Sequence, residues 1–174
     1  MQKCLCVILG SEVSGRPVHG QKHPELQQVR ASFHGLVQEL TTHMMKEEMV
    51  LFPYIVRMEE AVIQKEPVLL SPFGSVQHPV SMMEHEHDSA GNALRAMREA
   101  SSGYTAPTEA CISYQTLYKA LADFEADLHQ HIHLENNILF PRVSLVVKRC
   151  ENRLLVDGAG FADSESRENR HLAL

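Results

Sequence analysis

Hydrophobic residues recur along three stretches of the chain with the period of an α-helix. The first stretch begins at Pro24, which suits the first turn of a helix because its missing N–H would have no partner there. The other two cover about residues 76–100 and 107–147, and prolines, glycines and serines separate the stretches. Three long amphipathic helices with short connections are typical of an antiparallel helical bundle, so we predict an all-α fold.

Two of the predicted helices carry the same motif. Residues 43–53 and 131–141 both read His-x-x-x-Glu-x-x-x-Leu-Phe-Pro. Residues four apart lie on one face of a helix, so each copy places an imidazole beside a carboxylate. All four side chains fall on the apolar stripes of their helices, and so does one histidine in the middle of the intervening helix. We therefore expect five polar residues in the core, namely His43, Glu47, His87, His131 and Glu135.

A metal ion is the simplest explanation for these five positions. An ionised glutamate buried without a partner costs on the order of several kcal/mol. Imidazoles and carboxylates together suit iron, manganese or zinc. A structural zinc site more often uses cysteines, and the ferritin-type motif spaces Glu and His three residues apart rather than four. One such pair alone is more often a surface contact, but the second copy and the third histidine favour a metal site.

The other prominent residues have simpler explanations. We expect the Leu-Phe-Pro triplets to pack in the core, with Pro53 kinking its helix or ending the regular part. We expect Cys111 and six methionines to fill the core, namely Met44, Met45, Met49, Met82, Met83 and Met97. Two roles stay open for Glu84 and Glu86: they orient ligands or relay protons, or they belong to a solvated face. Four histidines lie off the stripes and are expected to face solvent, namely His34, His85, His129 and His133.

Composition narrows the class of protein. A chain of 174 residues with 44% apolar and 22% charged residues suits one globular domain. The net charge of −6 and the lack of a basic stripe argue against nucleic-acid binding. The four cysteines form no CxxC or zinc-ribbon spacing, which favours reduced thiols in the cytoplasm. The apolar run at residues 5–9 is too short for a signal peptide or a membrane span.

Four segments resemble one known family. They are residues 43–55 (HMMKEEMVLFPYI), 82–91 (MMEHEHDSAG), 107–118 (PTEACISYQTLY) and 131–142 (HIHLENNILFPR). Together with Val18 and His19 they are similar to the hemerythrin-like (HHE cation-binding) domain of the iron–sulfur cluster repair di-iron proteins, the RIC family. The resemblance covers about residues 18–145. We predict an irregular segment at 1–17, this domain at 18–148 and a disordered tail at 149–174.

The resemblance implies a metal site and a function. Two non-haem iron ions, joined by an oxo or hydroxo bridge, would be held by six residues, with the glutamates bridging and the histidines terminal: His19, His43, Glu47, His87, His131 and Glu135. It assigns no catalytic residue. The family restores iron–sulfur clusters damaged by nitric oxide or oxidative stress, so damaged iron–sulfur proteins are the implied partners. Two alternatives stay open: an oxygen or nitric oxide binding or sensing module, and a partial domain with an incomplete metal site.

The start of the chain departs from the family. Full-length members begin with a small domain bearing a Cys-Cys pair, which Cys4 and Cys6 do not match. Residues 1–17 contain no histidine and read poorly as the family's first helix, which contributes another histidine ligand. We therefore expect a domain that is truncated or altered ahead of Val18, with the first helix short or missing. One hypothesis is that a second copy of the chain covers the open face in a homodimer.

Overall fold

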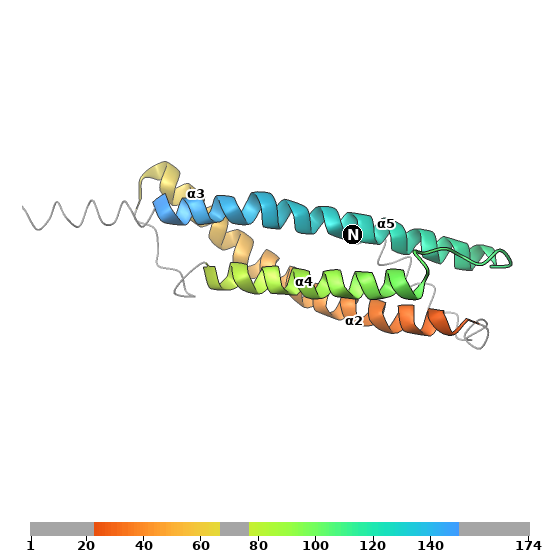
Figure 1. Ribbon diagram of the computed structural model, residues 1–174. Helices are drawn as coiled ribbons and strands as arrows, with labels where there is room; N and C mark the ends of the chain where they lie inside the picture. The colour runs from red at the N-terminus through yellow and green to blue at the C-terminus, as the bar shows by residue number, and fades with distance from the viewer. Residues whose placement is uncertain (1–22, 67–76, 150–174) are drawn as a thin grey trace, which may run out of the picture.

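The computed structural model describes residues 23–66 and 77–149, and these form three long helical rods (Figure 1). The first rod consists of α2 (Pro24–Lys46), the π-helical turn η1 (Glu47–Leu51) and α3 (Phe52–Gln64). The second is α4 (Gln77–Ala100). The third consists of α5 (Ile112–Leu134), the π-helical turn η2 (Glu135–Leu139) and helical residues 140–149. The predicted irregular segment at 1–17 and nearly all of the predicted tail lie outside the described residues.

The described rods form an antiparallel bundle. The first and third rods run in one direction, and α4 runs between the same two ends in the other (Figure 1). Pro24 occupies the first turn of α2, as its missing N–H predicts. The third rod begins at Ile112 rather than at the predicted residue 107, because residues 107–110 form a turn in which Ala110 N–H bonds to the Pro107 carbonyl at 2.9 Å. Cys111 is therefore the N-cap of α5 and is exposed, so the expectation that it fills the core is wrong.

The two π-helical turns occupy equivalent positions in the two copies of the repeated motif. Each begins at the glutamate and ends at the leucine, and the N–H of the next phenylalanine bonds five residues back: Phe52 to the Glu47 carbonyl, and Phe140 to the Glu135 carbonyl. The proline that follows has no N–H, and in an α-helix its ring would clash with the carbonyl four residues earlier. The regular α-helix ends at Lys46, ahead of Pro53, and the rod continues through the wider π turn into α3, whose first turn contains Pro53.

Two apolar clusters hold the rods together. The long core contains residues of α2, the C-terminal half of α4 and most of α5: Val29, Phe33, Leu36, Leu40, Ala90, Leu94, Met97, Tyr114, Tyr118, Leu121, Phe124 and Leu128. The short core contains residues around the π turns and the start of α4: Leu51, Ile55, Met58, Val80, Met83, Phe140 and Val143. On every rod the predicted metal ligands lie between these two sets. A polar layer therefore separates two apolar cores.

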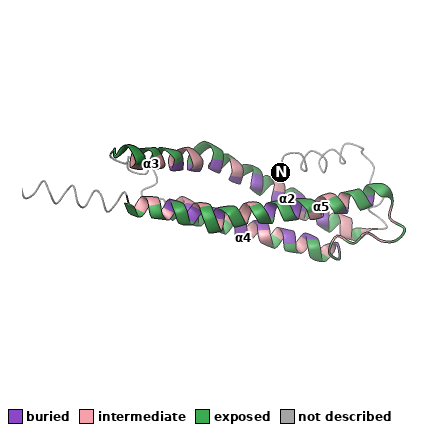
Figure 2. Cartoon of the chain, turned by 90° about the horizontal axis from the view of Figure 1, so that it is seen from above, coloured by how far each residue is buried: buried purple, intermediate pink, exposed green. Residues whose placement is uncertain are grey.

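Burial follows the predicted stripes except near the π turns, at Cys111 and at three methionines (Figure 2). Met83 and Met97 are buried, whereas Met45, Met49 and Met82 are exposed, which contradicts the expectation for those three. The helical spacing that places His131 and Glu135 on the buried stripe also predicts Ile138 there, but Ile138 is 56% exposed. Because η2 holds more residues per turn than an α-helix, it rotates Ile138 away from the core and brings Phe140 in.

Candidate metal centre

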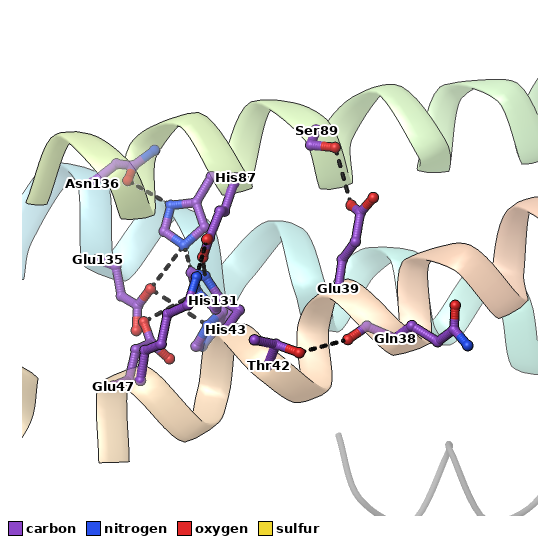
Figure 3. Close-up of polar contacts among 12 residues, drawn as sticks. Gln38, Glu39, Thr42, His43, Glu47, His87, Ser89, His131, Glu135 and Asn136 are labelled. Carbon is purple, nitrogen blue, oxygen red and sulfur yellow. Dashed lines mark hydrogen bonds and ion pairs between the residues drawn. The ribbon is translucent and has the colours of Figure 1, made fainter. Parts of the chain in front are cut away.

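The polar layer brings together five of the six predicted ligands (Figure 3). His43 and Glu47 come from the first rod, His87 from α4, and His131 and Glu135 from the third rod. Each residue offers one ligand atom, and these atoms all lie within 4.8 Å of one another. The sixth predicted ligand, at position 19, lies outside the described residues. Both copies of the repeated motif thus face the centre, one from the first rod and one from the third.

The five side chains differ in their access to solvent. His43, Glu47, His87 and Glu135 are buried, with exposed fractions of 2% to 5%. The His131 side chain is 26% exposed. Ion–dipole and ion–ion interactions are strong in such a water-poor setting. Among the described residues of the cluster, His131 is therefore the one whose side chain is most exposed.

Distances within the cluster are those of groups that converge on one small volume. The Nε2 atoms of His43 and His87 lie 3.1 Å apart. The same two nitrogens lie 3.2 Å from Glu47 Oε1 and 3.1 Å from Glu135 Oε2, respectively. His131 Nε2 lies 3.4 Å from Glu135 Oε2. Each carboxylate therefore lies close to the imidazole of its own rod, and Glu135 also lies close to His87 on α4.

Two residues outside the cluster orient the imidazoles. Glu86 Oε2 accepts a hydrogen bond from Nδ1–H of His43 at 2.8 Å, and Asn136 Oδ1 accepts one from Nδ1–H of His87, also at 2.8 Å. A neutral imidazole carries one N–H, so these bonds leave both Nε2 atoms as bare lone pairs. Two lone pairs that face each other at 3.1 Å repel unless a proton or a metal ion lies between them.

The charges around the cluster are balanced by these bonds. Burial lowers the pKa of His43, but the nearby carboxylates of Glu47 and Glu86 raise it more, so the pKa lies above its usual value. Burial raises the pKa of Glu135, but the imidazole of His87 at 3.1 Å and the charge of His131 hold the pKa below its usual value. Both shifts favour the charged forms of these groups, which attract each other.

The unpaired atoms of the cluster fit a metal ion. Among the described residues, Glu47 Oε1, His131 Nε2 and Glu135 Oε2 are buried without a hydrogen-bond partner. Buried polar atoms are normally paired, so such orphans need an explanation. Three imidazoles and two carboxylates form a donor set that suits iron, manganese or zinc. The residues present therefore fit a bound cation, and their side chains would hold it at the middle of the bundle.

The sequence left Glu86 with two roles and did not single out Asn136. The structure places Glu86 against His43, while Glu84 is exposed. Asn136 follows Glu135 directly, whereas the equivalent residue of the first copy, Glu48, is exposed. The repeat therefore held no signal for Asn136. The histidines expected to face solvent, His34, His85, His129 and His133, are exposed as predicted.

A second set of buried polar groups lies in the long core. Glu125 is only 4% exposed, and the Nε–H of Arg98 donates to its Oε1 at 2.8 Å. The guanidinium also lies over the ring of Tyr104, 5.4 Å from its centroid. Tyr114 O–H donates to Glu25 at 2.9 Å near the start of α2. These contacts tie the turn after α4 and the N-terminus of α2 to α5.

An antiparallel helical bundle with a buried His/Glu cluster at mid-length defines the class of hemerythrin-like metal-binding proteins. The family model of the hemerythrin HHE cation binding domain matches residues 8–143, and the chain belongs to this family. The match begins ahead of Val18, where the resemblance in the sequence motifs starts. None of the described helices is long and apolar enough to cross a lipid bilayer.

Curated relatives carry names that refer to cluster repair. The chain is 40% identical over 107 residues to the iron-sulfur cluster repair protein YtfE of Musicola paradisiaca, covering 62% of this chain and 42% of that protein. It is 38% identical over 126 residues to YtfE of Yersinia pseudotuberculosis, covering 72% and 51%. It is 40% identical over 116 residues to YtfE of Pectobacterium atrosepticum, covering 63% and 47%. The chain thus spans about half the length of these relatives.

Proposed function

We propose that the chain holds two non-haem iron ions and takes part in the repair of iron–sulfur clusters damaged by nitric oxide or oxidative stress. One observation carries this proposal: five histidine and glutamate side chains converge within 4.8 Å, with lone pairs facing one another. The family supports a bound cation, and the names of the relatives support repair. The family indicates a cation site, and the presence of two iron ions is the part of the proposal that goes further.

Each ligand has a proposed role. Glu47 and Glu135 would bridge the two ions, because they approach the centre from two different rods. The three histidines of the cluster would be terminal ligands, and His19 would supply a further one. Iron bound there would supply redox and ligand-exchange chemistry. The protein's own contribution is to hold the donor atoms in place and to limit the access of water.

The proposed partners are damaged iron–sulfur proteins in the cytoplasm, and a second copy of the chain. A homodimer is supported by exposed apolar side chains on the same rod as His131: Leu134 is 46% and Ile138 is 56% exposed. Native mass spectrometry of the iron-loaded chain tests this point. A strictly monomeric chain at micromolar concentration would remove the homodimer from the proposal.

Iron content and absorption test the metal centre. After anaerobic reconstitution, we expect two iron ions per chain and the near-ultraviolet bands of a bridged iron pair. Glu47→Gln and Glu135→Gln should each lose iron, because a carboxamide is a neutral and weaker ligand. His129→Ala, an exposed histidine on the same rod as His131, is the matched control and should keep its iron. Fewer than about one iron ion per wild-type chain would instead support a partial domain with an incomplete site.

A repair assay separates the main proposal from its alternative. The iron-loaded chain should restore activity to a [4Fe–4S] enzyme inactivated by nitric oxide, and the iron-free chain should not. The access to solvent at His131 favours one alternative, an oxygen or nitric oxide binding or sensing module. A chain that binds either gas reversibly, keeps its iron and restores no activity would establish that alternative.

A further inference from the structure

His43 and His87 meet the centre in the same way but have different partners on their outer sides. Both present Nε2 inward, 3.1 Å apart, and both donate Nδ1–H at 2.8 Å. The acceptor for His43 is the carboxylate of Glu86, whereas the acceptor for His87 is the amide oxygen of Asn136. The two hydrogen bonds are equal in length and differ in the charge of the acceptor.

The charge on Glu86 is retained although the residue lies at the edge of the bundle. Its side chain is 27% exposed, and Lys46 Nζ binds the oxygen that His43 leaves free. Glu86 is an anion at neutral pH, because a lysine ammonium lies at one of its oxygens and an imidazole N–H at the other. Asn136 has no charge at any pH and is partly buried.

An anionic acceptor changes the imidazole that it binds. A carboxylate attracts the Nδ1 proton more strongly than an amide oxygen does, which increases the electron density at the opposite nitrogen. The Nε2 of His43 is then the stronger donor to a cation, and the Nε2 of His87 is the weaker one. Glu86 does not belong to the group of converging ligand atoms, and Asn136 Oδ1 is engaged with Nδ1 of His87, so both act through the imidazoles.

We propose that Glu86 and Asn136 are positioning residues that make His43 and His87 unequal ligands, with His87 the one that gives way first when a metal ion leaves. This inference rests on the proposed metal centre and deepens it. A protein that donates iron needs both retention and release. The carboxylate on α4 favours retention through His43, and the neutral amide on η2 favours release through His87.

Two nearly isosteric substitutions test the proposal in opposite directions. Glu86→Gln keeps a hydrogen-bond acceptor at Nδ1 of His43 but removes its charge, and Asn136→Asp adds a charge at Nδ1 of His87. With Co²⁺ as the probe, we expect Glu86→Gln to weaken binding and Asn136→Asp to tighten it, each by ~10–100-fold. Dissociation into a chelator should be faster in the first variant and slower in the second, and the d–d bands of bound Co²⁺ should shift in opposite directions.

Matched controls separate ligand tuning from general electrostatics. Glu84→Gln and Asn137→Asp change the same charges at exposed neighbouring positions that do not bond to His43 or His87. Screening by solvent should limit their effect on Co²⁺ affinity to less than about threefold. Circular dichroism of the metal-free variants would show whether each variant folds.

The possible results are distinguishable. Opposite shifts in affinity and in the d–d bands, beyond those of the controls, support the proposal. Shifts of the same sign in both variants, shifts no larger than those of the controls, or a loss of folding in both would overturn it, because a purely structural role predicts these results. These experiments measure Co²⁺ binding and not cluster repair. A chain that fails in the repair assay could therefore still support or contradict the roles of Glu86 and Asn136. A wild-type chain that binds no Co²⁺ would overturn the metal centre itself.

Discussion

Phe140 lies parallel to His87, with ring centroids 6.0 Å apart and an interplanar angle of 7°. Phe140 is 2% exposed and belongs to the short core. Its ring restricts one face of the imidazole, while Asn136 holds Nδ1. The expectation that the Leu-Phe-Pro triplets pack in the core is therefore right for Phe140. The same packing also fixes a candidate ligand.

Truncation of this ring should affect both stability and metal binding. We expect Phe140→Ala to lower the free energy of unfolding by ~3–5 kcal/mol, as is usual for a buried phenylalanine. It should also weaken Co²⁺ binding, because His87 loses its support. Phe124→Ala, in the long core and 0% exposed, should cost a similar amount but leave the affinity unchanged. Urea denaturation and Co²⁺ titration measure both quantities, and an equal loss of affinity in the two variants would contradict the role of Phe140.

Removal of either buried glutamate from the metal-free protein should lower the free energy of unfolding only slightly. Breaking a buried ion pair usually destabilises by about 3–5 kcal/mol. Glu47→Ala and Glu135→Ala should each cost less than that, because the opposing carboxylate remains beside the imidazoles. Both variants should lose iron. Denaturation of the iron-free variants, together with their iron content, tests this prediction, and a variant that keeps its full iron content shows that its carboxylate does not bridge.

The π turns should behave as one-residue insertions. In a Pro53→Ala background, deletion of the exposed Met49 should leave a continuous α-helix in which Leu40 and Ile55 both still face the core. Deletion of the exposed Arg57 should instead rotate Met58 by ~100° out of the short core. Urea denaturation should show the first deletion to be far better tolerated. Equal loss of stability in the two deletion variants would mean that η1 does not set the register.

Glu125 should depend on Arg98 for its burial. Arg98→Met removes the partner of a buried carboxylate, so we expect a lower melting temperature. Adding Glu125→Met should recover much of the loss, because the double variant buries no unpaired charge. A double-mutant cycle by thermal denaturation measures the coupling. Additive effects of the two substitutions would show that the ion pair contributes nothing.

The N-terminus of α2 should add an acid-sensitive contribution to stability. A hydrogen bond to its own main chain is the largest cause that lowers the pKa of Glu25 below 4.5; burial opposes this, and bonds to Tyr114 and His23 add to it. A carboxyl with a lowered pKa in the folded state stabilises the protein above its unfolded pKa, and the contribution is lost as the pH falls through the folded value. Glu25→Gln should therefore be less stable than wild type near neutral pH, and the difference should shrink in acid. A difference in stability between the two proteins that stays constant down to about pH 3 would contradict the acid-sensitive contribution of Glu25.

The helical period predicted most of the fold and the five polar positions of the cluster, four of them buried and His131 partly exposed. His43, Glu47, His87, His131 and Glu135 could be found because each repeats the spacing of its apolar neighbours, and the structure brings them together. Helix periodicity is set by the backbone, so a polar residue on the stripe is visible in the sequence alone.

Other features depend on local changes of the helix or on interactions between rods, and a regular helical period does not encode them. The period predicts that Ile138 is buried, but the extra residue of η2 rotates its side chain outward. Glu125 is next to Phe124 at the edge of the stripe, and its burial depends on the ion pair with Arg98 on α4. Asn136 follows the same rule, since its partner His87 belongs to another rod.

The polar layer between the long core and the short core has a consequence for how the protein comes apart. Each core is apolar and continuous, but the two meet across carboxylates and imidazoles instead of hydrocarbon. A cation in this layer would fasten three rods at one level and make unfolding a single event. Without it, we expect the end that contains the smaller short core to open first. Whether iron is bound would then determine how fast proteases degrade the chain in the cell.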